Sequence, residues 1–130
     1  MLLDTNILID FHRKTNKEKS ILWKIDPSIT LYISTLTCFE LLRGADTLNL
    51  KEEAIELIET FNIIDFTYDI SVLASENEII MNKSNHHIEE IDLFIGCTGI
   101  YKNIPVLTLN TKHFENIPNI ILADLSLYLN

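Results

Sequence analysis

The chain has few of the residues that cross-link a fold or interrupt its helices and strands. It contains only two cysteines, three glycines and three prolines among 130 residues. Cys38 and Cys97 lie in apolar stretches with no cysteine or histidine nearby at zinc spacing, which predicts reduced core residues in the cytoplasm. No window is repetitive or rich in glycine or proline. We therefore expect a single domain, residues 1–130, that folds without disulfides or a structural metal.

Positive charge is also scarce. Ten Lys and Arg face nineteen Asp and Glu, giving a net charge of −9. This balance argues against a broad surface that coats phosphates, although an acidic protein can still cut nucleic acid if divalent cations offset the repulsion. It would also suit a basic partner protein. No apolar run reaches the roughly 18 residues that span a bilayer, and no basic segment precedes the first strand, so we expect no membrane anchor or targeting signal.

Short apolar runs alternate with segments of helical length. Strands are predicted at 1–3, 31–33, 62–66 and 105–107, with a fifth candidate at 119–122. Helices are predicted at 6–13, 36–45, 50–61, 69–82 and 88–101. Thr5 is the expected N-cap of the first helix, and Gly44 ends the second. The alternation predicts an α/β fold with a central parallel sheet of four to five strands and helices on both faces.

Three carboxylates interrupt otherwise apolar stretches: Asp4, Glu40 and Asp92. Ligands of parallel sheets bind beyond the carboxyl ends of the strands. Asp4, Glu40 and Asn110 each follow a predicted strand, and Asp92 begins a helix that could reach the same crevice. Convergent acids of this kind hold Mg²⁺ or Mn²⁺ for phosphodiester hydrolysis. The alternative is that Asp4 and Asp92 only complement helix dipoles and that Glu40 is solvated.

Four segments resemble the PIN-domain ribonucleases, and among these the VapC-type toxins of bacterial and archaeal toxin–antitoxin pairs. They occur in the family's order as LDTNILI (3–9), TLTCFELLRGA (35–45), IDLFIG (91–96) and LTLNTKHF (107–114). The resemblance covers nearly the whole chain and implies a single PIN-like domain. It implies that Asp4, Glu40 and Asp92 bind the metal, with Thr5 and Thr108 as supporting hydroxyls.

Asn110 departs from the family pattern. It stands at the fourth catalytic position, where many members carry an acid, and its neutral amide predicts a weaker second metal position.

The resemblance implies a metal-dependent endoribonuclease that acts on RNA and is often a homodimer. It also implies a small antitoxin partner that inserts a side chain, commonly Arg, into the acidic site. The segments around 21–23 and 50–61 could serve these contacts or simply pack the core.

Two other functions remain open at this point. A catalytically inactive PIN-like module for binding or regulation is kept open by Asn110. A receiver-like phosphoacceptor domain would find partial counterparts in Asp65 and in residues 102–105. However, Asp4 lacks the acidic neighbour that a receiver needs, and Lys102 precedes the strand that leads to Thr108, whereas a receiver would have it after that strand.

Several residues near these motifs have more than one interpretation. Gly96 and Gly99 share a helical face with Asp92, which suits close helix packing or room for substrate. Arg43 could pair with Glu40 or with a phosphate. His113 stands where the family often has an acid, and could contact RNA or a partner or have no role.

Two further clusters are weaker candidates. His86 and His87 are adjacent, so their side chains point apart and zinc binding is disfavoured. The basic stretch 13–19 follows the helix that begins at the acidic site, and is a candidate contact for the RNA backbone.

Overall fold

The central element is a four-stranded parallel sheet. The computed structural model describes residues 1–129. The strands lie in the order β3-β2-β1-β4, and their bounds are Leu2–Leu3 for β1, Tyr32–Ser34 for β2, Asn62–Ile64 for β3 and Val106–Leu107 for β4. Leu2 pairs with Tyr32 on one side and with Val106 on the other. The predicted parallel α/β fold is confirmed.

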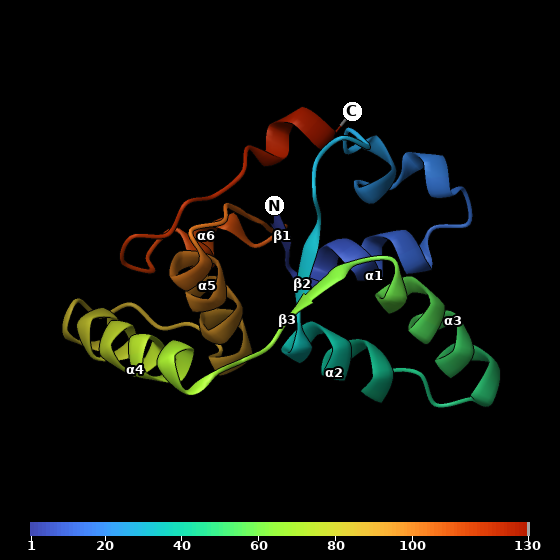
Figure 1. The fold of residues 1–130 in the computed structure, drawn as a ribbon. Coiled ribbons are helices and arrows are strands. Elements are labelled where there is room, and N and C mark those ends of the chain that lie inside the picture. Colours follow the sequence, from blue (N-terminus) through green and yellow to red (C-terminus); the bar gives the residue numbers. More distant parts are fainter. Residues whose placement is uncertain (130) are drawn as a thin grey trace.

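Helices cover both faces of this sheet, as Figure 1 shows. Their bounds are Thr5–Arg13 for α1, Thr35–Arg43 for α2, Leu48–Glu59 for α3, Tyr68–Lys83 for α4, Glu90–Lys102 for α5 and Thr111–Phe114 for α6, with short 3-10 turns η1 at Lys17–Lys19, η2 at Leu22–Lys24 and η3 at Leu125–Tyr128. In Figure 1, α1, α2 and α3 lie on one side of the strands, and α4, α5 and α6 on the other. Within residues 1–129, no helix combines the length and apolar character needed to cross a membrane.

The strands divide their side chains between two hydrophobic cores. Leu2, Ile64 and Val106 belong to the core that also contains buried residues of α4 and α5. Leu3, Ile33 and Leu107 belong to the other, together with buried residues of α1 and α3. Successive strand residues point to opposite faces, so a two-residue strand such as β1 contributes to both cores. Both cores hold the carboxyl ends of the strands in place.

The fifth candidate strand contributes only one bridge. Leu122 pairs in parallel with Val106, and the flanking bonds run from Val106 N to Ile121 O and from Ala123 N to Val106 O, each 2.9 Å. Asn119, where this strand was expected to begin, has a φ of 66°. That left-handed backbone cannot continue an extended strand. The sheet therefore has four strands, and the chain beyond β4 adds a single contact at its edge.

The predicted N-cap of the first helix was wrong by one residue. Asp4 is the cap, and its carboxylate accepts from the backbone N–H of Thr5 at 2.8 Å. Thr5 is instead the first residue of α1, and its hydroxyl points toward α2. The helix α3 also begins earlier than predicted, because Thr47 caps it by accepting from the N–H of Leu50 at 3.2 Å.

Gly96 and Gly99 serve close packing. A Cβ at Gly96 would lie 2.5 Å from Cδ1 of Ile117, and a Cβ at Gly99 would lie 2.5 Å from Cγ2 of Val106 and 3.0 Å from the carbonyl oxygen of Ile104. Both glycines are buried in α5. They let α5 approach β4 and the chain that follows α6, and so fix where the first turn of α5, with Asp92, meets the sheet.

Candidate metal and active site

Asp4 is the most buried of the three predicted metal-binding acids. It directly follows β1 and is 3% exposed. Its Oδ1 accepts from Thr5 N at 2.8 Å, and its Oδ2 accepts from the hydroxyl of Thr108 at 2.7 Å. The pKa of Asp4 is raised from 3.8 to about 6, chiefly by burial and also by the charges of Asp92 and Glu40, against the lowering effect of these two hydrogen bonds. The carboxylate is held rigidly, and its negative charge is poorly compensated.

Glu40 is fixed from two sides. The hydroxyl of Thr5 donates to its Oε1 at 2.6 Å and also lies 3.0 Å from the hydroxyl of Thr37. Its Oε2 lies 3.6 Å from a guanidinium nitrogen of Arg43, one turn later on α2. The predicted pairing of Arg43 with Glu40 is therefore present. Through Thr5, the end of β1 and the middle of α2 are connected at the site.

Asp92 lies in the first turn of α5, as predicted, and is partly buried. Burial raises its pKa, and so do the charges of Glu40 and Glu89, whereas the side chains of Asn110 and His113 lower it. Asp92 is thus within electrostatic reach of Glu40 and of the chain after β4. The four predicted catalytic residues lie at one end of the sheet.

Thr108 connects three parts of the site. Its hydroxyl donates to Asp4 and accepts from the side-chain amide of Asn6 at 3.3 Å and from the backbone N–H of Asn110 at 3.0 Å. Asn6 also accepts from the N–H of Leu109 at 3.2 Å. No role for Asn6 was predicted from the sequence. Its position two residues after Asp4, in the first turn of α1, is the sequence feature that could have indicated one.

The donor set suits a hard divalent cation, because it consists of carboxylate, hydroxyl and amide oxygens. In the described positions, however, no three Asp, Glu, His or Cys side chains among residues 1–129 lie close enough to hold one ion together. Both oxygens of Asp4 and both of Glu40 contact the surrounding protein. Glu40 and Asp92 are only partly buried, and the residues fit a metal in type and in charge.

Comparison with known proteins agrees with this geometry. A family model described as "PIN domain" matches residues 1–120. This chain belongs to the PIN-domain family. Ribonuclease VapC1 of Methanocaldococcus jannaschii is 30% identical over 118 residues, which cover 90% of this chain and 80% of that protein.

Solved structures of VapBC proteins share the fold. The structure of VapBC-1 from nontypeable Haemophilus influenzae superposes with a TM-score of 0.77 at 26% identity, covering 96% of this chain and 97% of that one. VapBC2 from Rickettsia felis, bound to a DNA fragment from their promoter, gives a TM-score of 0.78 at 24% identity, covering 94% and 96%. The predicted PIN-like fold is thereby confirmed.

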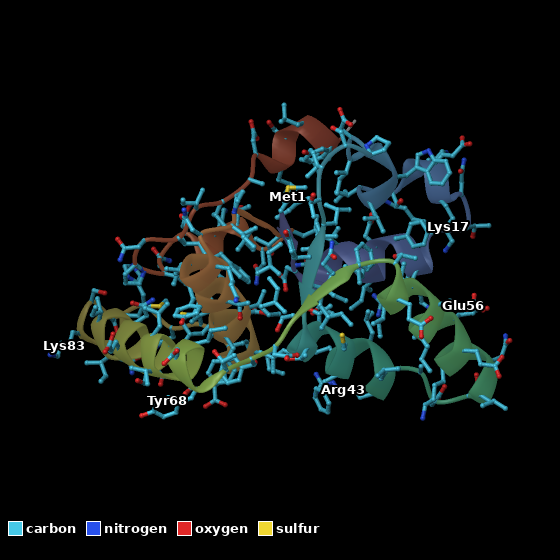
Figure 2. All side chains as sticks on the ribbon, in the orientation of Figure 1. Met1, Lys17, Arg43, Glu56, Tyr68 and Lys83 are labelled. Carbon is cyan, nitrogen blue, oxygen red and sulfur yellow. The ribbon has the colours of Figure 1, made fainter. Side chains whose placement is uncertain are left out.

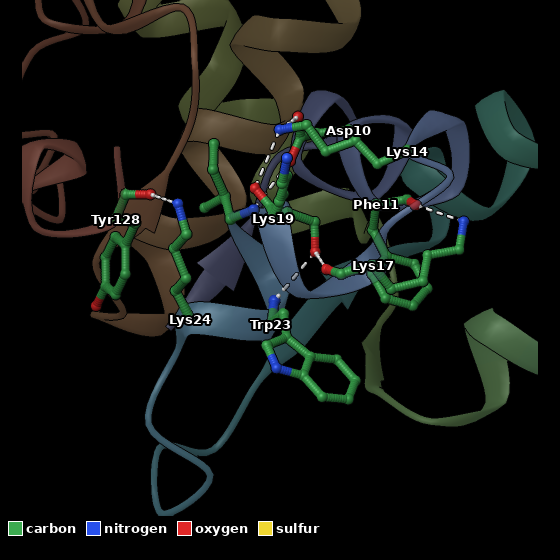
Figure 3. Close-up of polar contacts among 10 residues, drawn as sticks. Asp10, Phe11, Lys14, Lys17, Lys19, Trp23, Lys24 and Tyr128 are labelled. Atoms are coloured by element: carbon green, nitrogen blue, oxygen red, sulfur yellow. Dashed lines mark hydrogen bonds and ion pairs between the residues drawn. The ribbon is translucent and has the colours of Figure 1, made fainter. Parts of the chain in front are cut away.

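The basic stretch 13–19 has a structural use in this PIN domain (Figure 3). The ammonium group of Lys17 donates to the carbonyl oxygens of Phe11 at 2.7 Å and His12 at 2.9 Å, and Lys14 pairs with Asp10 at 2.7 Å. These lysines complement the C-terminal end of α1. Arg13 instead lines a hollow of about 160 Å³ together with Glu40, so within this stretch Arg13 lies nearest to the site.

Proposed function

We propose that this chain is a divalent-metal-dependent endoribonuclease that hydrolyses RNA and is the toxin of a type II toxin–antitoxin pair, with Mg²⁺ or Mn²⁺ as its ion. The observation that carries the proposal is the coupled group of Asp4, Glu40 and Asp92 at the carboxyl end of a PIN-domain sheet. Relatives named as ribonucleases support RNA as the substrate. An RNA substrate and the free thiols of Cys38 and Cys97 fit a cytoplasmic location.

The proposed roles follow from how each side chain is held. Asp4, Glu40 and Asp92 would hold the ion, which when bound lowers the pKa of a water nucleophile and offsets charge on the scissile phosphate. Thr108 and the backbone of Thr5 fix both oxygens of Asp4. Thr5 orients Glu40. The side chain of Asn110 lowers the pKa of Asp92 and so partly offsets the rise caused by burial and by the charges of Glu40 and Glu89.

The direct test is cleavage of total cellular RNA by purified protein without its partner. We expect discrete fragments in Mg²⁺ or Mn²⁺ and none in EDTA, because the uncompensated carboxylates require a cation before a phosphate can approach. Folded protein that leaves RNA intact in both metals would contradict the ribonuclease. If that protein still bound RNA or a partner, the inactive binding module would be the better assignment.

A groove on the face formed by α1, η2 and α3 fits the proposed antitoxin. It has a volume of about 680 Å³, and its lining includes Phe11, Leu22, Trp23, Ile25, Leu57 and Phe61. Trp23 is 59% exposed. Leu57 also lines the smaller hollow that contains Glu40, so the two cavities are neighbours on α3.

An occupant of that groove could continue toward the acidic site. An apolar helix would cover Trp23, and a following basic side chain could enter beside Glu40, where a net charge of −9 favours a cationic partner. Similar structures include toxin–antitoxin complexes. We include in the proposal a small antitoxin in this groove and two copies of this chain in the complex.

Trp23→Ala tests the antitoxin groove. We expect cells that produce the wild-type chain to grow slowly, and genomic fragments from the source organism that restore growth to encode the antitoxin. The same fragments should fail to protect cells producing Trp23→Ala, because truncating a central aromatic anchor typically costs about 2 kcal/mol or more.

The matched control is Tyr68→Ala. Tyr68 is 81% exposed and begins α4, which lies across the sheet from α1 and α3 (Figures 1 and 2). The Tyr68→Ala variant should remain toxic, and the same genomic fragments should restore the growth of cells that produce it. Equal rescue of both variants would exclude the groove, and light scattering of the purified complex would show whether it contains two copies of this chain.

A further inference from the structure

A second cleft lies beside Asp92, and the proposed reaction does not use it. It has a volume of about 290 Å³ and is lined by His87, Ile88, Glu89 and His113. Three of these residues directly precede α5, and the fourth lies on α6. Glu89 and His113 both affect the pKa of Asp92, so the cleft adjoins the reaction centre. A molecule bound there would lie next to the scissile phosphate.

His113 is held in a defined position. Its Nδ1 lies 2.8 Å from the side-chain nitrogen of Asn110. The carbonyl oxygen of Asn110 accepts from the N–H groups of His113 at 3.0 Å and Phe114 at 3.2 Å, and Phe114 is fully buried. When Nδ1 accepts from the Asn110 amide, the imidazole carries its proton on Nε2. His113 therefore offers the cleft an N–H donor on a fixed turn.

The other lining residues define what can bind. Glu89 contributes a carboxylate acceptor, His87 a second imidazole and Ile88 an apolar surface. A phosphate would be repelled by Glu89, whereas a flat heterocycle with N–H groups next to a carbonyl would match both the acceptor and the donor. The cleft volume lies near the lower end of small-ligand pockets, which is about 300 Å³. A single base is of a size that this cleft accommodates.

We propose that this cleft binds one unpaired guanine base of the RNA next to the scissile phosphate. Glu89 accepts from the N1 and N2 groups of guanine, and His113 donates to its O6. Uracil, adenine and cytosine each lack this arrangement of two adjacent donors beside a carbonyl. Unpaired bases expose these edges in single-stranded RNA. The inference rests on the proposed ribonuclease function and adds its base preference.

A base subsite also accounts for how so acidic a chain could hold RNA. With a net charge of −9, contacts to phosphates contribute less than they do in basic RNA-binding proteins. Contacts to a base edge and stacking on an imidazole depend little on net charge, and stacking alone contributes about 1–3 kcal/mol per base in other proteins. The cleft supplies both kinds of contact.

The test uses single-stranded RNA oligonucleotides that contain the mapped cleavage site. The nucleotide on each side of the cut is changed in turn to each of the four bases, and kcat and KM are measured. We expect the wild type to prefer guanine at one of these positions. Glu89→Gln and His113→Ala should each lose roughly tenfold in kcat/KM on the guanine substrate, mainly through KM, and change little on the other three.

Adjacent residues of the same type provide matched controls. Glu90→Gln alters the first residue of α5, outside the cleft lining, and His86→Ala alters a histidine that contacts Ser84 at 3.3 Å. Both should keep the wild-type preference. Inosine, which lacks the N2 amino group, should weaken cleavage by the wild type and leave Glu89→Gln nearly unaffected, a coupling that a purely structural role of Glu89 would not produce.

The outcomes separate this inference from the proposed function. Cleavage with no base preference, or an equal loss by the cleft variants on all four substrates, would overturn the guanine subsite and leave the ribonuclease intact. A cleft variant that cuts like the wild type but escapes the antitoxin would reassign the cleft to the partner and overturn it too. Failure of the wild type to cut any RNA would remove both assignments together.

Discussion

Asp92→Asn should reduce RNA cleavage by about two orders of magnitude or more and leave the protein folded. The loss follows because an amide replaces one of three proposed anionic ligands, and changes around a metal site commonly cost about 10- to 100-fold even outside the first ligands. Folding should be unaffected or improved, because burial and the charges of Glu40 and Glu89 disfavour the ionised Asp92. Cleavage rates and thermal melting, measured in parallel, check both parts.

Glu90→Gln is the matched control for this change. Glu90 lies in the same turn of α5 but is exposed, so its loss should leave cleavage close to that of the wild type. Unchanged cleavage by Asp92→Asn would remove Asp92 from the mechanism. Loss of cleavage together with loss of the folded state would attribute the effect to stability instead of metal binding.

Asp4→Asn should stabilise the metal-free protein at neutral pH and abolish its response to metal. The pKa of Asp4 is raised to about 6 from 3.8. The folded state therefore binds more protons than the unfolded state between these values, and stability falls as pH rises from about 4 to about 6. Above pH 6 the cost is fully present. The shift corresponds to at most about 3 kcal/mol, and Asn removes the charge.

Chemical denaturation in EDTA at several pH values measures this difference. We expect Asp4→Asn to exceed the wild type by about 1–3 kcal/mol at pH 7.5 and to lose this advantage near pH 4. The upper part of that range assumes that the Thr108 hydroxyl can reorient to contact the new amide. Mg²⁺ should then raise the Tm of the wild type but not of the variant, because the ion compensates a charge that only the wild type has.

Asp26→Asn is a control at a carboxylate whose pKa is shifted in the opposite direction. Hydrogen bonds from Ser28 lower the pKa of Asp26, so its ionised form is favoured by folding and its removal should give no gain at neutral pH. If Asp4→Asn were no more stable than the wild type at pH 7.5, or if both variants gained equally, the buried charge of Asp4 would not be a source of instability.

Together these predictions describe a site that is unfavourable until a cation binds. The charges of Asp92 and Glu40 raise the pKa of Asp4, and the charge of Glu40 raises that of Asp92. Among residues 1–129, hydroxyl, amide and backbone donors, His113 and the exposed Arg43 offset this negative charge. Protein stability is thereby traded for metal affinity, a common feature of functional sites. The same unfavourable charge explains why a cationic antitoxin side chain would be a suitable inhibitor.

The amino-acid sequence alone predicted the parallel α/β fold and the residues of the acidic site. Short apolar strands and helical periodicity are local properties. Asp4 and Glu40 each follow a strand within a few residues, and Asp92 lies in the first turn of a helix, so a common edge of the sheet could be deduced. The PIN-domain motifs reinforced this deduction. Metal number and the identity of the RNA were not encoded in any local pattern.

Only the tertiary structure decided which polar groups meet. Thr108 and Asp4 are 104 residues apart and share a 2.7 Å hydrogen bond, and Thr5 turned out to orient Glu40 instead of capping α1. The close packing interpretation of Gly96 and Gly99 was decided by Ile117 and Val106, which lie on other segments of the chain. The cleft at Glu89 likewise requires His113 from α6. Local spacing fixes the face on which a side chain lies, but its partner depends on how the crossovers pack the helices against the sheet.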